Sequence, residues 1–332
     1  PNFFMITLMA RGEADCDGGT CTARALITEK VGSYGPAVGE GGPSVPLTAR
    51  STLPPGGTAE IVPNPNAGGI GVPVSAWVNQ TNCPAPFPPP PDNPFDPNGG
   101  SWSTCEAQEW YGTDTQPEDF KCPSAECRCG PGEKRLSYSD NTGQQWGIDL
   151  LADDLAFPCD LWQYMLGQPK YDEEGKINQD SIDFIRNSLA DEVLDAADCD
   201  QLGPDSVGYI WIEGGTCKIA ANTQIGSPID DPATEKVEGP VFLISAAESL
   251  SLAGVASVFG TLFITDAQVS SAAFESVGPF TVYGAAVIDA ELDKYSGTFQ
   301  VVYVEDVIKS SVEAGKFGAV AGGWTDVHPD WR

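Results

Sequence analysis

The chain is poor in histidine and in positively charged residues. Its 332 residues include one histidine, His328, and 17 lysines and arginines against 47 aspartates and glutamates. A single histidine argues against triads and against other histidine-based acid–base catalysis. The net charge of −30 argues against binding to nucleic acid, whose phosphates are held by clusters of lysine and arginine. It equally argues against docking on an anionic membrane surface.

Long hydrophobic runs are also missing. No stretch approaches 18 apolar residues, so we expect no transmembrane segment in this chain, and no signal peptide is visible. The chain opens at Pro1 with "FFMITLMA", which has the pattern of a strand, so we expect a longer precursor with a targeting or anchoring segment upstream.

Known catalytic motifs are absent too. There is no G-x-S-x-G, P-loop or H-E-x-x-H sequence. A glycosidase with two carboxylates stays formally open, but with 47 acidic residues their proximity in sequence carries no information. We therefore predict a protein that is not an enzyme.

Cysteines, in contrast, are numerous and even in number. A zinc site would need C-x-x-C pairs or histidines at ligand spacing, and "CPSAECRC" from Cys122 to Cys129 has neither. We favour structural disulfides over zinc, which implies an oxidising compartment. We expect Cys16–Cys21 to close a short turn and Cys199–Cys217 to tie a helix end to the following strand, and we leave the other pairings open. The ten candidate disulfide cysteines are Cys16, Cys21, Cys83, Cys105, Cys122, Cys127, Cys129, Cys159, Cys199 and Cys217.

Calcium is the one cofactor that the sequence brings into consideration. "DNPFDPNGG" offers Asp92, Asp96 and Asn98 as oxygen ligands before a glycine. This resembles a calcium loop but fails the D-x-D-x-D-G spacing and lacks the glutamate at position 12. "DLLADD", from Asp149 to Asp154, is a second acidic cluster. The competing interpretation is that both are solvated acidic loops, and we predict no other cofactor.

The amino-acid composition divides the chain into two regions. Residues 1–140 are rich in proline, glycine and cysteine, and within them residues 1–30 predict a β-hairpin around "DCDGGTC". Residues 141–332 contain one convincing helix, predicted over 180–197, and short β-rich runs from Val207 onward. Five tryptophans lie between residues 77 and 162; they predict either a small core under loops or, if exposed, a carbohydrate-binding surface.

A repeat near the end of the chain points to a particular β architecture. "VFGTLFI" at 258–264 returns as "VYGAAVI" at 282–288, 24 residues later, an interval typical of stacked coils. In such a stack Gly260 and Gly284 would lie one above the other, where one backbone approaches another closely. The alternative is an ordinary antiparallel sheet. The predicted fold class is mainly β (α+β): a short stacked β-coil or β-sheet in the C-terminal region, one amphipathic helix, and long disulfide-stapled loops.

A series of short motifs in the second half of the chain gives a family resemblance. The segment from Gly143 to Trp324 resembles the C-terminal region of PilX-like minor pilins of type IV pili. The motifs that carry it are Gly147 to Leu155, Phe157, Pro158, Asp160, Leu161, Cys199, Ser206, Gly208, Ile210, Trp211, Gly215, Cys217, Ile225 to Pro228, Gly260 to Phe263, Tyr283 to Ala285, Val301 to Tyr303, and Gly322 to Asp326.

The resemblance implies a non-enzymatic extracellular structural subunit at a bacterial cell surface or pilus. Its partners would be other pilin subunits and a pilus-tip adhesin, and its role would be pilus assembly and adhesion. A pilin begins with a hydrophobic helix, which this stretch of sequence does not contain. The alternative is a secreted cell-surface module that binds glycans or proteins through the tryptophan-rich loops.

Overall fold

The architecture was determined from a computed structural model of the chain. The residues that it describes are 5–17, 20–33, 43–50, 57–65, 73–79, 83–88, 101–112, 117, 120, 127–129, 139, 149–152, 154–228, 239–252, 254–268, 272–290, 292–310 and 317–327.

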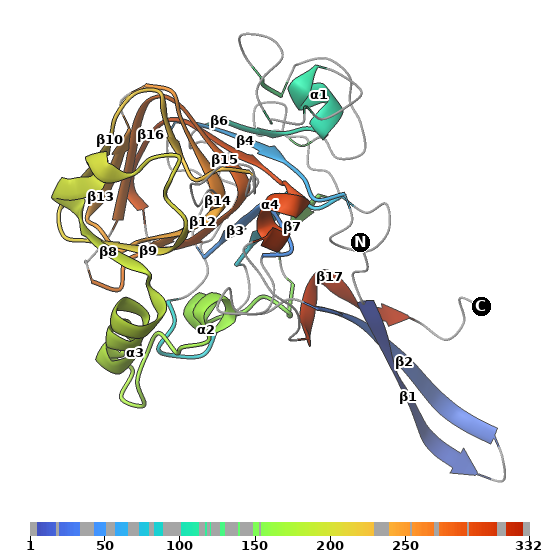
Figure 1. Cartoon of the computed structure of the whole chain (residues 1–332). Helices are drawn as coiled ribbons and strands as arrows, with labels where there is room; N and C mark the ends of the chain where they lie inside the picture. The colour runs from blue at the N-terminus through green and yellow to red at the C-terminus, as the bar shows by residue number, and fades with distance from the viewer. Residues whose placement is uncertain are drawn as a thin grey trace.

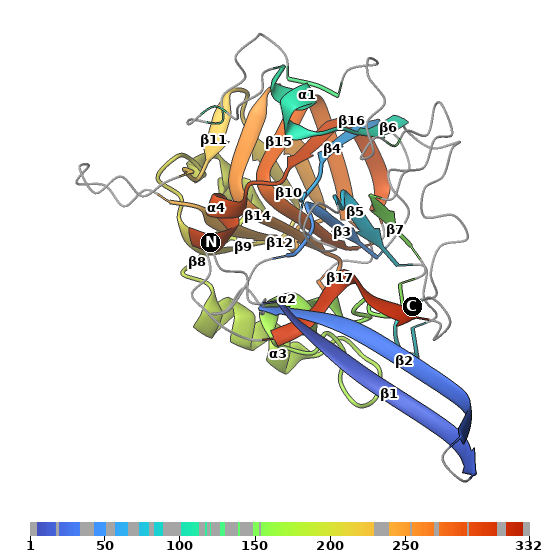
Figure 2. The same ribbon diagram turned by 90° about the vertical axis from the view of Figure 1, so that its right-hand side faces the viewer.

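Most of the regular structure is one large sheet of fourteen strands among the described residues, and its strands pair in parallel. Its main path runs β6-β4-β16-β15-β14-β12-β9-β8 (Figures 1 and 2). The predicted mainly β fold is therefore confirmed. The strands are β3 (Leu47–Ala49), β4 (Thr58–Val62), β5 (Ala76–Val78), β6 (Ser101–Thr104), β7 (Leu150–Leu151), β8 (Glu192–Asp195), β9 (Gly208–Glu213), β10 (Thr216–Ile219), β11 (Thr223–Ile225), β12 (Val241–Ser245), β13 (Ser249–Leu252), β14 (Ala256–Thr265), β15 (Ala272–Asp289) and β16 (Leu292–Val302).

The two repeated segments lie side by side in this sheet. β14 and β15 are parallel, and their register pairs Val258 with Val282 and Gly260 with Gly284. The antiparallel alternative is therefore wrong for this pair. Both glycines have positive φ angles, +141° and +143°, and a Cβ on Gly284 would collide with the backbone oxygen of Gly260. Glycine is required here because both backbones adopt positive φ angles at a point where one backbone approaches another closely.

Alternating residues of the strands fill separate hydrophobic layers. Leu243 and Leu262 are register partners and belong to the largest buried cluster, whereas their neighbours Ile244 and Phe263 belong to a second cluster. The second cluster includes Leu161, Trp162 and Ile182 from two helices, α2 (Leu161–Leu166) and α3 (Gln179–Phe184). Both faces of this part of the sheet are consequently buried, as expected for parallel strands. A third cluster lies under α1 (Ala107–Tyr111) and α4 (Glu305–Ser310).

The helix predicted over residues 180–197 is wrong in its second half. The α-helix α3 continues into a π-helical turn, η1 (Ile185–Leu189), and the chain then enters β8, followed by a 3₁₀ turn, η2 (Ala196–Gln201). Val193 continues the helical spacing in sequence, but in strand β8 it is 40% exposed, so it does not belong to the buried helix face. The N-cap is Asn178, two residues before the predicted start, and its side chain accepts from the backbone N–H of Ser181. The prediction of a single helix also missed α1, α2 and α4.

The two predicted regions contribute to the same sheet. β3 and β4 lie before residue 140 in sequence, yet they pair with β15 and β16. β3 in turn pairs with β5, and β4 with β6. The N-terminal strands therefore continue the sheet beyond the last strands of the C-terminal region.

A second sheet of three strands stands apart from the first. β1 (Met5–Asp17) and β2 (Thr20–Ser33) form the predicted antiparallel hairpin, and β17 (Phe317–Val327) pairs with β2. Figures 1 and 2 both show the tip of the hairpin pointing away from the body of the protein.

Disulfides join segments that are distant in sequence. The structure gives Cys83–Cys159, Cys105–Cys129 and Cys199–Cys217, and none of the described cysteines is free. The Cys199–Cys217 prediction is confirmed, although Cys199 lies in the 3₁₀ turn η2 and not at the end of the α-helix. Cys16 is the register partner of Cys21 across the hairpin. Cys127 is also disulfide-bonded, while Cys122 lies outside the described residues.

Candidate functional site

Charged residues gather where neighbouring parallel strands end. Asp195 and Glu213 are register partners at the ends of β8 and β9, and Asp289 ends β15. Asp266 and Arg50 directly follow β14 and β3. The carboxyl ends of parallel strands lie at one edge of a sheet and commonly form binding sites. We call this line of residues the carboxyl-end row; it has a buried part and an open part.

The buried part is a cluster of two cations and two carboxylates. The Arg50 guanidinium donates to Asp266 at 2.7 Å, and its Nε lies 3.5 Å from Asp289. The Lys170 ammonium donates to Asp266 and to Asp289, both at 2.7 Å. The Lys170 and Asp289 side chains are only 1% and 2% exposed. The cluster is therefore electrically balanced and almost closed to water.

Local capping places Lys170 in this cluster. Asp160 caps α2, where one carboxylate oxygen accepts from the backbone N–H of Gln163 and the other from that of Lys170. Gly167 ends the helix in a left-handed conformation, φ +69°, which favours glycine. A six-residue helix with a fixed beginning and end thus directs the following segment toward the strand ends.

Burial dominates the electrostatics of Asp289. Loss of water around the carboxylate raises its pKa above the ordinary value, and the charges of Lys170 and Arg50 oppose this only in part. Burial is the largest single influence on the pKa of Arg50, and it lowers that pKa. The attractions of Asp289 and Asp266 together outweigh burial, so the pKa of the guanidinium is raised. A buried charged group with such partners stabilises a fold only while the partners remain.

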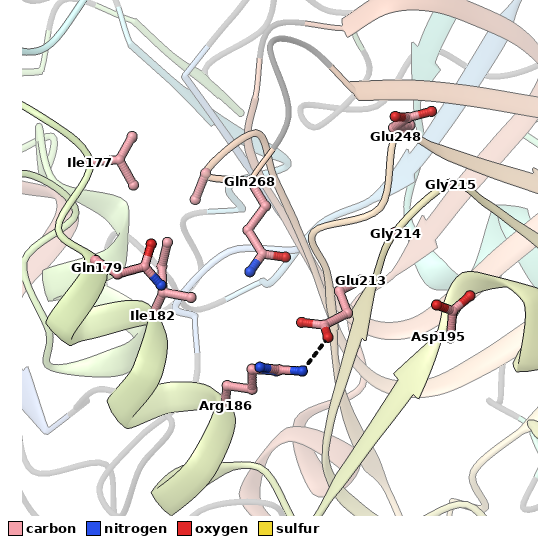
Figure 3. A pocket seen from close by; sticks show the side chains of 11 residues that line it. Ile177, Gln179, Ile182, Arg186, Asp195, Glu213, Gly214, Gly215, Glu248 and Gln268 are labelled. Carbon is pink, nitrogen blue, oxygen red and sulfur yellow. Dashed lines mark hydrogen bonds and ion pairs between the residues drawn. The ribbon is translucent and has the colours of Figure 1, made fainter.

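The open part of the row is a polar groove of about 690 Å³. Figure 3 shows α3 on one side and the ends of the strands on the other, with Gln268 between them. Arg186 reaches across and donates to Glu213 at 2.6 Å. The other oxygen of Glu213 accepts from the buried indole N–H of Trp211 at 3.0 Å. The groove is lined by Ile177, Gln179, Ile182, Arg186, Asp195, Glu213, Gly214, Gly215, Glu248, Ala267 and Gln268.

The predicted calcium ligands Asp92, Asp96 and Asn98 lie outside the described residues. In the second acidic cluster, Asp149 is completely buried and accepts from the hydroxyls of Ser75 and Ser139, both at 2.7 Å. Burial raises its pKa. Asp149 is thus a hydrogen-bonded core residue and not a solvated loop carboxylate. Within the described part of the chain no group of three or more acidic, cysteine or histidine side chains could hold a metal ion.

The tryptophans form cores and not an exposed surface. Trp77, Trp102, Trp110 and Trp162 are each at most 3% exposed, and Trp146 lies outside the described residues. The indole N–H of Trp162 donates to the hydroxyl of Thr265. The prediction of a core under loops is confirmed for these four, and the version of the glycan-binding hypothesis that depended on their exposure is wrong for them.

Sequence reasoning missed the carboxyl-end row. Its members come from positions 50, 170, 195, 213, 266 and 289, and no short motif joins them. One signal was available: Asp266 and Asp289 follow corresponding ends of the two repeated segments. His328, the single histidine, lies outside the described residues.

Comparison of the chain with protein-family models, with curated proteins and with solved structures finds no significant match in any of the three. Among the described residues, no helix is long and apolar enough to cross a membrane. Chemically, the open groove offers carboxylates, amides and one guanidinium for hydrogen bonds, and the buried cluster is closed to a diffusing ligand.

Proposed function

We propose that this chain is a non-enzymatic extracellular structural subunit, a PilX-like minor pilin or pilus-tip component in type IV pilus assembly and adhesion. Its partners would be other pilin subunits and a tip adhesin at a bacterial cell surface. The motif order in the sequence suggests the family. The observation that carries the structural role is a large parallel sheet together with three disulfides, which join segments 76, 24 and 18 residues apart.

The disulfides support the location. Disulfides persist in oxidising compartments outside the cytosol, and links of this kind resist local unfolding in a protein that carries mechanical load. The large net negative charge keeps such a domain dispersed in a salty medium. A pilus subunit needs both properties.

We further propose that the parallel sheet is a short stacked β-coil. In this interpretation β10, β11 and β12 make one turn, and the chain continues through β13 and β14 to the next. The supporting observation is that β10 pairs with β13, while β11 and β12 pair with successive parts of β14. A stack of this kind gives a stiff rod without hinges.

The filament assignment is tested by locating the protein in cells of the source organism. Filaments sheared from the surface would be separated by centrifugation and analysed by mass spectrometry and by immunogold labelling with an antibody to this chain. The proposal expects the chain in the filament fraction and its loss from that fraction when the major pilin gene is deleted. A chain that stays in the supernatant in both strains would contradict it.

The groove favours a second candidate function, a secreted cell-surface module that binds glycans or proteins. Gln179, Gln268 and Glu248 offer amides and a carboxylate suited to hydroxyl-rich or cationic ligands. A glycan array with the purified chain would test this, with Glu248→Gln as the variant and Glu192→Gln, an exposed change outside the groove, as the control. Binding that Glu248→Gln weakens and the control keeps would favour this function.

A further inference from the structure

The ammonium group of Lys170 is held against a carboxyl group in a dry site. Its Nζ donates to Oδ2 of Asp289 at 2.7 Å and to the backbone oxygen of the same residue at 3.2 Å. It also donates to Oδ1 of Asp266 at 2.7 Å. The carboxyl carbon of Asp289 is one bond beyond Oδ2, so the nucleophile and its target are held close together. Because folding already holds the two groups together, the reaction step avoids most of the entropic cost of bringing them together.

The charges of the cluster allow a neutral form of this pair. Arg50 stays protonated at all accessible pH values, and its guanidinium donates to Asp266 at 2.7 Å. The hydrogen bond from Nζ of Lys170 to Oδ2 of Asp289 is the path along which one proton passes in the proposed reaction, to give an amine beside a carboxylic acid. The transfer leaves no formal charge on either group in a dry interior. The raised pKa of Asp289, caused by burial, acts in the same direction.

We propose that Lys170 and Asp289 form an intramolecular amide bond without any cofactor. The neutral Nζ attacks Cγ of Asp289, a bond forms between Nζ and Cγ, and the bond between Cγ and one Oδ breaks. Asp266 is the catalytic residue: its Oδ1 accepts a proton from Nζ and passes it to the leaving oxygen. The products are an amide and one water molecule. No oxidant or reductant is needed, and Arg50, 3.5 Å from Oδ1 of Asp289, stabilises the negative charge that develops on the carboxyl oxygen.

The product is consistent with the surroundings. Arg50 and Asp266 remain as a matched ion pair, so no buried charge is left alone. The new bond joins the segment after α2 to the end of β15, 119 residues apart. It resembles the disulfides in effect but does not respond to reduction. This inference does not depend on the pilin assignment.

The test is the intact mass of the folded, full chain after reduction of its disulfides. The proposal expects a mass lower than the sequence mass by one water molecule. Proteolysis should then release a branched peptide that joins the Lys170 and Asp289 segments. A folded chain with the full sequence mass would overturn the proposal and leave an ion-pair cluster only. Water loss that maps to a succinimide at Asp17–Gly18, an Asp-Gly sequence, would overturn it as well.

Variants separate the roles of the residues. Lys170→Arg keeps the positive charge but cannot form this amide, so it should show the full mass. Asp266→Asn keeps both reacting groups and should slow or abolish the water loss. Asp289→Asn should lose ammonia instead of water. Lys176→Arg, an exposed site nearby, is the matched control and should keep the branched peptide. If a variant does not fold, the mass and peptide map of the native chain still decide.

Discussion

Gly260 and Gly284 are register partners on adjacent parallel strands, and the backbone oxygen of Gly260 occupies the space that a Cβ on Gly284 would need. Both residues also have φ angles near +140°, which L-residues with a side chain rarely adopt. The glycines of the 24-residue repeat therefore lie where the two adjacent strands are so close that neither position has room for a side chain.

Replacement of Gly284 by alanine should destabilise the protein strongly. The backbone strain and the collision with Gly260 together are expected to cost roughly 2 to 5 kcal/mol of unfolding free energy. Gly203→Ala is the control, since a Cβ there has nothing within 4 Å and should change stability by no more than about 0.5 kcal/mol. Urea unfolding of both variants measures the difference. Equal stability of the two variants would contradict the close approach of the strands.

The buried Arg50 ion pair should matter far more than the half-exposed Arg186 pair. The two have similar distances, 2.7 and 2.6 Å, but the arginine side chains are 8% and 41% exposed. Arg50→Met leaves the two carboxylates Asp266 and Asp289 with Lys170 as their one shared cation, at a cost of about 3 to 5 kcal/mol. Arg186→Met should cost less than about 1 kcal/mol. Thermal and urea unfolding of both variants tests this ranking, and a reversed order would contradict the account of the cluster.

Loss of the Cys199–Cys217 disulfide should lower stability by about 3 kcal/mol, since its closed loop of 18 residues restricts the unfolded chain. The double variant Cys199→Ala with Cys217→Ala avoids a free thiol. Urea unfolding against the native chain gives the difference. Because η2 is held against β10 by this bond, hydrogen exchange should accelerate first in η2 and β10. Unchanged exchange there would indicate that the disulfide has no local role.

Stability should depend on pH through the buried carboxylate of Asp149. Burial raises its folded pKa above the ordinary 3.8, so the folded state binds the proton more tightly than the unfolded state. Its stabilising contribution is fully present below the unfolded pKa and is lost as the pH rises through the folded pKa. Asp149→Asn should therefore gain stability relative to the native chain between pH 4 and pH 7.

The measurement for this prediction is a series of unfolding curves over that pH range. Asp200→Asn, at an exposed position, controls for the removal of one negative charge from an acidic protein. A difference between Asp149→Asn and the native chain that stays constant with pH would show that Asp149 does not titrate differently in the folded state.

Local patterns predicted a limited part of this structure. The turn chemistry around residues 17–20 predicted the β1–β2 hairpin, and the repeat predicted that Gly260 lies beside Gly284. The short spacing between Cys199 and Cys217 was sufficient for one disulfide pair. These features depend on residues close in sequence or on a repeated motif.

Non-local pairing explains what sequence reasoning missed. β3 pairs with β15, which lies more than 200 residues later in the chain, and nothing in the sequence "LTA" at 47–49 indicates this partner. Val193 fits a helical period but lies in a strand because β9 offers it a parallel neighbour. Lys170 is one of 17 basic residues. It becomes a buried partner of carboxylates only because the capped helix α2 directs it toward two distant strand ends, those of β14 and β15.

The most direct test of the pilus proposal is the coding sequence immediately upstream of Pro1. The proposal predicts a short basic leader, a glycine, and then a run of about 20 apolar residues that would form the anchoring helix. A conventional cleaved signal peptide ending directly before this chain would contradict it, and would make the protein a freely secreted domain with a parallel β fold.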